Sequence, residues 1–220
     1  MRKEMELSEL RKIVRKGAGE DLEFKRKATH PHRIAREVIA FANTNGGKLL
    51  VGVDDDKTIY GCKYAGEEAF AITSFLEAHC RPRIPFQLKH ISINSKREVL
   101  VFDIPESRRK PHFLNYENQR QTFVRVEDMS ITASQEMITV LKNSHKKTGV
   151  SIRFGDREKT LFQYLEKFEN ITLAETQKLL KITRRNASGL LVIMVRAGLL
   201  TIHPTEKGDF FRLMPDAFEV

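Results

Sequence analysis

Acidic side chains in the first third of the chain could support a metal-dependent reaction on phosphate. Glu20 directly precedes one predicted strand and Glu23 lies within it, and Asp55 lies in a run of three aspartates directly after a second strand. Carboxylates that converge from neighbouring strands can hold Mg²⁺ or Mn²⁺, which stabilises charge on a scissile phosphate. Aspartate also forms turns readily, so the same run could simply end the strand. The catalytic candidates are Glu20, Glu23 and Asp55.

Candidates for phosphate binding lie between these acids. Lys25 follows Glu23 by two residues, and the helix before the second strand ends in Asn45-Gly46-Gly47. Asparagine and glycine tolerate left-handed backbone, and the amides that such a turn exposes can receive an anion. Two structural explanations remain open. The turn could only end the helix, and Lys25 could pair with Glu23 on a sheet surface.

Motifs for other cofactors are absent from the sequence. The stretch NGGKLL lacks the GxxxxGK[ST] spacing of a nucleotide-binding P-loop. Cys62 and Cys80 form no CxxC pair and are predicted to be buried free thiols. His30 and His32 precede a helix and are expected to face solvent. We therefore predict no metal or cofactor, except Mg²⁺ or Mn²⁺ if the carboxylates are catalytic.

The composition predicts a soluble protein with a polyanionic partner. Of 220 residues, 40% are hydrophobic and 30% are charged, as in folded domains. No apolar run approaches the roughly 20 residues of a membrane span, and the charged N-terminus is not a secretory signal. We expect a cytoplasmic protein with no membrane partner. The net charge of +9 favours DNA or RNA, although many soluble proteins are basic for no specific reason.

Hydrophobic periodicity predicts a mixed α/β domain over residues 1–145. The expected helices lie near 4–16, 30–43, 66–80 and 132–143, and the expected strands near 21–27, 48–53, 86–93, 98–104 and 122–127. The nearly continuous apolar run Lys48–Val53 predicts a central strand covered on both faces. Thr132 with Gln135 three residues later predicts a capping box for the last helix.

Residues 105–119 are expected to form a mobile surface loop, because they are polar and basic and contain two prolines. A basic loop beside a charged sheet could follow a phosphate backbone. It could equally serve only solubility. The candidate phosphate contacts of the first domain are Lys25, Arg108, Arg109, Lys110 and Arg125.

A second domain is predicted over residues 146–220, after a linker at 144–149. Three helices near 159–168, 173–180 and 183–197 precede a hairpin of strands 199–204 and 210–214. This order predicts a small winged helix-turn-helix domain, with Thr172 and Thr183 capping the second and third helices. The overall fold class is α+β.

The third of these helices carries the candidates for reading DNA bases. Arginine pairs with guanine and asparagine with adenine in the major groove, and a wing lysine can contact phosphate. These candidates are Arg184, Arg185, Asn186, Ser188 and Lys207. Residues 151–220 contain 11 basic against 9 acidic residues, whereas residues 1–150 contain 27 against 20. A domain with so little excess charge could instead mediate only protein contacts.

Three motifs together resemble a known family. LEFKRK, AFANTNGGKLLVGVDDDKTIYG and TFVRVEDMSITAS have the order and spacing of the Schlafen/AlbA-type nucleic-acid-binding domain over about residues 15–143. The resemblance implies a mixed α/β core that binds DNA or RNA. Prokaryotic members often carry a C-terminal winged helix and are commonly described as transcriptional regulators.

The resemblance also bears on catalysis. A related core in animal Schlafens cleaves transfer and ribosomal RNA with three acidic residues. Two of them correspond to Glu23 and Asp55, but the third corresponds to Ala18. Glu20 could replace it only if the Gly17-Ala18-Gly19 turn rearranged. The resemblance therefore favours binding over cleavage.

We predict a DNA-binding transcriptional regulator that dimerises to match a two-fold operator. A metal-dependent RNA endonuclease and a protein-interaction adaptor without a nucleic-acid role are the two alternatives.

Overall fold

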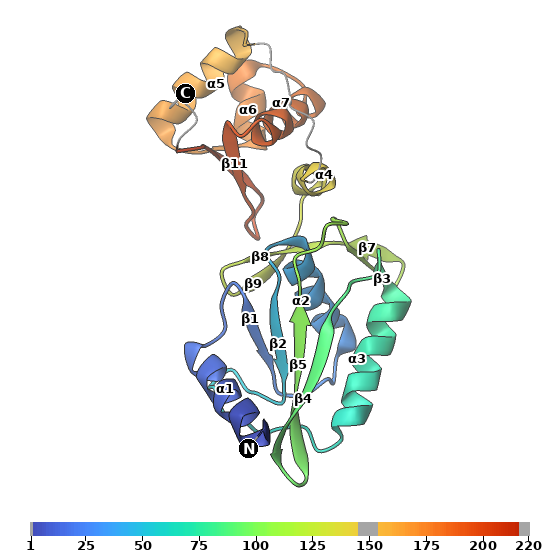
Figure 1. The fold of residues 1–220 in the computed structure, drawn as a ribbon. Coiled ribbons are helices and arrows are strands. Elements are labelled where there is room, and N and C mark those ends of the chain that lie inside the picture. The colour runs from blue at the N-terminus through green and yellow to red at the C-terminus, as the bar shows by residue number, and fades with distance from the viewer. Residues whose placement is uncertain (1, 145–153, 216–220) are drawn as a thin grey trace. The chain divides into compact units, whose positions relative to one another are not determined.

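The computed structural model describes residues 2–144 and 154–215 (Figure 1). The chain folds as two units, Met1–Thr132 and Ala133–Val220. The helices of the first unit are α1 (Arg2–Lys16), α2 (Pro31–Asn43) and α3 (Ala65–His79). Its strands are β1 (Leu22–Lys25), β2 (Gly47–Val51), β3 (Cys80–Arg81), β4 (Gln87–Asn94), β5 (Arg97–Ile104), β6 (Phe113–Tyr116), β7 (Gln119–Gln121), β8 (Phe123–Val126) and β9 (Met129–Thr132).

A four-stranded mixed sheet forms the centre of the first unit. Its strand order is β1-β2-β5-β4. β1 runs parallel to β2, with Leu22 opposite Lys48, and the other pairs are antiparallel. The apolar run that begins at Lys48 therefore forms an inner strand, as predicted, and β1 and β4 form the two edges.

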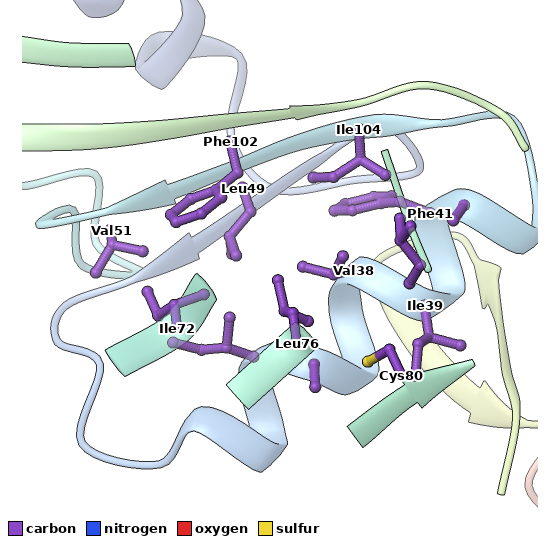
Figure 2. Packing of buried hydrophobic residues seen from close by; sticks show 14 of the residues in the cluster. Val38, Ile39, Phe41, Leu49, Val51, Ile72, Leu76, Cys80, Phe102 and Ile104 are labelled. Carbon is purple, nitrogen blue, oxygen red and sulfur yellow. The ribbon is translucent and has the colours of Figure 1, made fainter. Parts of the chain in front are cut away.

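Helices cover both faces of this sheet because successive side chains of a strand point to opposite sides. Leu49 and Phe102 pack with α2 and α3, as Figure 2 shows. Leu50 and Val101 point the other way and pack with Leu10 of α1. The result is three layers, with α1 on one side of the sheet and α2 and α3 on the other (Figure 1). The mixed α+β class is confirmed.

Two short hairpins depart from the predicted pattern. β6 lies inside residues 105–119, which were expected to be a loop, and pairs with β3 and β7. β9 pairs with β8 and contains Thr132, which was expected to cap a helix. Ser134 caps that helix instead, since its Oγ accepts a hydrogen bond from the Met137 amide at 3.0 Å. The predicted Thr132–Gln135 capping box was wrong.

The second unit contains four helices and three strands in its described part. They are α4 (Gln135–Asn143), α5 (Asp156–Phe168), β10 (Ile171–Thr172), α6 (Leu173–Leu180), α7 (Arg184–Arg196), β11 (Leu200–His203) and β12 (Phe210–Leu213). The strands form a sheet of order β10-β12-β11. A core around Leu161, Leu191 and Phe211 joins α5, α6 and α7 to this sheet.

The caps predicted for α6 and α7 are present. Thr172 forms a capping box with Glu175, and Thr183 Oγ1 accepts from the Asn186 amide. α4, which the sequence placed in the first domain, belongs to the second unit, where it packs on α7. Most of the predicted linker, residues 145–149, lies outside the described residues.

Candidate functional sites

A buried charge network occupies the β1 edge of the first unit. Its centre is Arg125 on β8, whose side chain is only 1% exposed. Nη1 lies 3.0 Å from Glu23 Oε2 on β1 and 2.9 Å from Glu37 Oε2 on α2. One guanidinium therefore joins three elements that are far apart in the sequence.

The other nitrogens of Arg125 bind backbone carbonyls. Nε and Nη2 donate to Gly19 O at 3.1 and 2.9 Å, and Nη2 also donates to Leu22 O at 3.3 Å. The guanidinium carbon lies 5.0 Å from the centre of the Phe41 ring. Every nitrogen of the guanidinium is thus engaged inside the protein. We predicted Arg125 to be a phosphate contact, and its burial contradicts that assignment.

Lys25 and Ser130 complete the network. Lys25 Nζ lies 2.8 Å from Glu23 Oε1 and 4.0 Å from Glu37 Oε1. Ser130 Oγ donates to Glu37 Oε2. Two cations therefore face two carboxylates, and the charges balance. The structural explanation of Lys25 as the partner of Glu23 matches this geometry, although its side chain remains 30% exposed.

The three catalytic candidates are not assembled. Glu23 is buried, and each of its carboxylate oxygens already faces a cation. Glu20 and Asp55 are exposed. Among the described residues, no group of three or more histidine, cysteine, aspartate or glutamate side chains is placed to hold a metal ion. The geometry therefore gives Glu23 a structural role at the β1 edge.

The Gly46-Gly47 turn is packed against protein backbone. Gly46 has φ +79°, and a Cβ there would lie 2.7 Å from Ile104 O and 2.8 Å from Glu106 N. Its amide donates to Phe41 O at 2.9 Å. A Cβ on Gly47 would lie 2.5 Å from the Phe41 ring. We predicted that this turn, with the exposed Asn45, offers amides to phosphate, but the Gly46 amide is already occupied, and both glycines are needed for close packing.

The segment that was expected to be a mobile loop is anchored at its centre. His112 is 0% exposed, and its ring nitrogens lie 2.8 Å from Pro82 O and 2.6 Å from Ser107 Oγ. Lys110, with a side chain 7% exposed, donates to Thr44 O at 2.8 Å and to Glu106 at 2.6 Å. We predicted Lys110 to be a phosphate contact, and its burial and its internal partners contradict that assignment.

Two of the predicted phosphate contacts, Arg108 and Arg109, remain exposed on this segment.

Burial lowers the pKa of His112 below its ordinary value of 6.5, so this side chain is held neutral at physiological pH.

In the second unit, the first turn of α7 presents polar side chains to solvent. Arg184, Arg185 and Asn186 are all exposed, and no acidic residue occurs in this turn. In the described part of the chain, neither arginine has an acidic partner within salt-bridge distance. Lys207 is exposed in the turn between β11 and β12. These four predicted residues are accessible.

Ser188 is the exception on α7. Its Oγ donates to the buried carboxylate of Glu136 on α4 at 2.6 Å. Ser134 at the start of α4 donates to Asp209, whose pKa is raised by burial and by the neighbouring Glu136. These polar contacts hold α4 to α7 and to the hairpin. Ser188 was predicted to read bases, but its hydroxyl serves this internal contact instead.

Comparison with known proteins identifies the first unit. Residues 19–134, just over half of the chain, match the Schlafen AlbA_2 family. The chain belongs to this family. No curated protein matches the sequence. Within the described residues of this AlbA_2 protein, no helix combines the length and apolar character that crossing a bilayer requires.

Two solved structures resemble the AlbA_2 chain more distantly. One is the N-terminal domain of a RecG-related protein from Nitrosomonas europaea, with 19% identity, a TM-score of 0.37, and coverage of 48% of this chain and 75% of that one. The other is a protein from Corynebacterium diphtheriae, with 15% identity, a TM-score of 0.41, and coverage of 89% of this chain and 34% of that one.

The structure explains the motifs that carry the family resemblance. Glu23 of LEFKRK meets Arg125 of TFVRVED in the buried network. Asn43 of AFANTNGGK donates from Nδ2 to Thr122 Oγ1 at 2.8 Å and accepts from the His112 amide at 2.8 Å. The sequence shows Asn43 as a polar residue at the end of an apolar helix, and this was the signal that could have indicated its structural role. No local pattern in the sequence points to Glu37, Ser130 or His112.

Proposed function

We propose that this AlbA_2 protein binds duplex DNA through its second unit and acts as a transcriptional regulator. The observation that carries the proposal is the first turn of α7, where Arg184, Arg185 and Asn186 are exposed without an acidic neighbour in that turn. The N-terminus of a helix is the positive end of its dipole, so cations there are unfavourable for the isolated fold. A phosphate-bearing partner would make the same charges favourable.

The other helices of the second unit follow the opposite rule. α4, α5 and α6 each carry an acidic residue in the first turn, as the helix dipole favours. α3 of the first unit does so as well, whereas α2 begins with a proline and carries no acid there. The arginines at the start of α7 are thus a departure from the pattern of their own domain.

The order of elements supports a winged helix-turn-helix. α6 and α7 are joined by the short Lys181–Thr183 connection, and the β11–β12 hairpin follows with Lys207 at its turn. In this motif the second helix enters the major groove, where arginine recognises guanine and asparagine recognises adenine. Lys207 would contact phosphate. The AlbA_2 match in the first unit supports a nucleic-acid partner for the whole chain.

The test compares two double variants that remove the same charge. Arg184→Ala with Arg185→Ala removes two exposed cations from α7. Arg157→Ala with Lys159→Ala removes two cations from α5 and serves as the control. Binding is measured with the full chain and duplexes selected from a random-sequence library, over a series of salt concentrations.

The α7 variant is expected to bind at least about tenfold more weakly and with a shallower salt slope, because two cations no longer lie against the DNA. It should also distinguish the selected duplex less well from unrelated duplexes, because the lost arginines recognise guanine edges. The α5 variant should stay close to the wild type. Equal losses in both variants would contradict the role of α7. A wild-type chain that binds no duplex at about 100 mM salt would favour the adaptor function instead.

A further inference from the structure

We infer that α7 receives the edge of a DNA base pair directly against its backbone at Gly189, and that Ile193 contacts a thymine methyl group beside it. This inference rests on the proposed function and identifies residues that would determine its sequence specificity. It adds a close-contact surface to the arginines and the asparagine at the start of the helix.

Nothing in the described part of the fold requires glycine at position 189. It lies in the interior of α7, where its φ is outside the left-handed region, and it is at least partly open to solvent. Apart from the adjacent residues and the backbone of α7 itself, no described atom lies within 4 Å of the position that a Cβ would occupy. Glycine in a helix interior lowers helix stability relative to alanine, roughly fivefold in the folding equilibrium. The described part of the fold gains nothing from this loss.

Other glycines of the chain have structural explanations that do not apply to Gly189. Gly46 and Gly47 are required because backbone and ring atoms lie closer than 3.0 Å to the place where a Cβ would stand, and Gly198 after α7 has φ +74°. Gly66 of α3 is as open as Gly189, but it lies in the first turn, where helix propensity has less influence. Gly189 is therefore best explained by a molecule that approaches α7 from outside.

The neighbours of Gly189 define what that molecule can be. Residues four apart lie on one face of a helix, so Arg185, Gly189 and Ile193 form a single row. Arg185 is exposed, and Ile193 is 40% exposed. Asn186 lies three residues before Gly189 on the same face. The row spans about 12 Å, or about three to four base pairs in the major groove.

The chemistry of the row changes along its length. Arg185 and Asn186 supply the donors that recognise purine edges. Gly189 presents only backbone, so a base edge can approach the helix axis more closely there than at any larger residue. Ile193 offers an apolar surface, and the thymine C5-methyl group is the apolar feature of the major groove. The selected sites should therefore contain a purine that is followed by a thymine within the same half-site.

The experiment separates fit to DNA from folding. Gly189→Ala should raise the stability of the protein to urea, because alanine is the better helix former and nothing in the described structure opposes its methyl group. The same variant should weaken binding to the selected duplex by about tenfold, since an added methyl group overfills a tight contact. A role confined to the fold would move stability and affinity in the same direction. Gly66→Ala is the matched control and should leave affinity unchanged.

A second variant tests the contact with thymine. Ile193→Ala should weaken binding to the selected duplex but not to the same duplex with uracil in place of the contacted thymine, because uracil lacks the methyl group.

The results with Gly189→Ala and with the wild type distinguish failure of the inference from failure of the proposed function. If Gly189→Ala binds as the wild type does, the inference is wrong while the proposed function stands. If the wild type selects no duplex, the proposed function itself fails. If Gly189→Ala changes the oligomeric state of the free protein and not its intrinsic affinity for DNA, the row is an interface between copies, which also overturns the inference.

Discussion

At the scale of single residues, Arg125 organises the edge of the AlbA_2 domain. Its guanidinium pairs with Glu23 and Glu37 and covers carbonyl oxygens of the β1 edge at Gly19 and Leu22. A buried arginine between two carboxylates is hard to remove, because the acids would remain buried with too little positive charge. Pairing with Arg125 thus explains why Glu23 and Glu37 lie at this edge, and a catalytic role is not needed to explain them.

The corresponding variant is Arg125→Ala. We expect it to lower the free energy of unfolding of the first unit by about 3–5 kcal/mol, the range for breaking a buried ion pair. Urea denaturation with and without the substitution measures the loss. Arg109→Ala on the exposed surface is the control and should change stability by less than about 0.5 kcal/mol. Equal effects of the two substitutions would show that the network contributes little.

His112 should make the stability of the first unit depend on pH. Burial lowers its pKa in the folded chain below 6.5, so between the two pKa values the unfolded chain binds more protons than the folded one. The stabilisation is therefore complete well above pH 6.5 and is lost progressively as the pH falls from about 6.5 toward the lower pKa of the folded chain. His112→Asn should be less stable than the wild type at about pH 7.5 but lose less stability on acidification to about pH 5.5.

The measurement is urea denaturation of both proteins at the two pH values. His30→Asn, which changes an exposed histidine, should keep the pH dependence of the wild type. The histidine assignment fails if His112→Asn and the wild type lose stability in parallel.

At the scale of elements, the connection from α2 to β2 depends on a glycine. Gly46→Ala would combine an unfavourable φ of +79° with a methyl group only 2.7 Å from Ile104 O. Both atoms that block the methyl group at under 3.0 Å belong to the backbone around the end of β5, which cannot move aside cheaply. We expect a loss of about 2–4 kcal/mol in urea denaturation. Gly66→Ala, at a position with open space, should cause no loss. A stable Gly46→Ala protein would contradict the observed turn.

The elements differ in how well the sequence predicts them. Long helices such as α2 and the inner strand β2 were predicted, because their apolar patterns repeat over many residues. β6, β9 and β10 were missed, since strands of two to four residues carry almost no periodicity and form through pairing with other strands.

The sites show the same division. Arg184, Arg185 and Asn186 were predicted from residue type and position at a helix start, which is a local pattern, and the structure shows that all three are exposed. The Arg125 network was misassigned because a cation in a predicted strand looks the same in the sequence whether it faces solvent or two buried acids. Its partners lie 88 and 102 positions away along the chain. Such long-range pairing cannot be read from local spacing.

At the scale of the whole molecule, the two units share the positive charge. Residues 1–132 contain 24 basic and 19 acidic residues, and residues 133–220 contain 14 and 10. The smaller unit therefore carries +4 of the net charge of +9. The earlier count gave only +2 for residues 151–220. It was smaller because it placed α4 and the residues that follow it, up to residue 150, with the first domain. An anionic partner of the second unit gains support from this distribution.

The stoichiometry of the complex tests the proposed regulator as an assembly. Under the proposed function, a chain that presents one α7 per copy would read only about three to four base pairs with it, so we expect two copies on one duplex, related by a two-fold axis. The duplexes selected by the full chain should then be inverted repeats whose half-site centres lie about 10 base pairs, or one helical turn, apart. Sedimentation of the complex should give two chains per duplex.

A duplex with a single half-site is the control. It should bind one chain with an affinity at least about tenfold lower, because the second copy no longer contributes. Inserting about five base pairs between the half-sites turns them to opposite faces of the DNA and should weaken binding as much as removing one half-site does. Sites without inverted symmetry that bind a single chain at full affinity would show that the protein acts as a monomer.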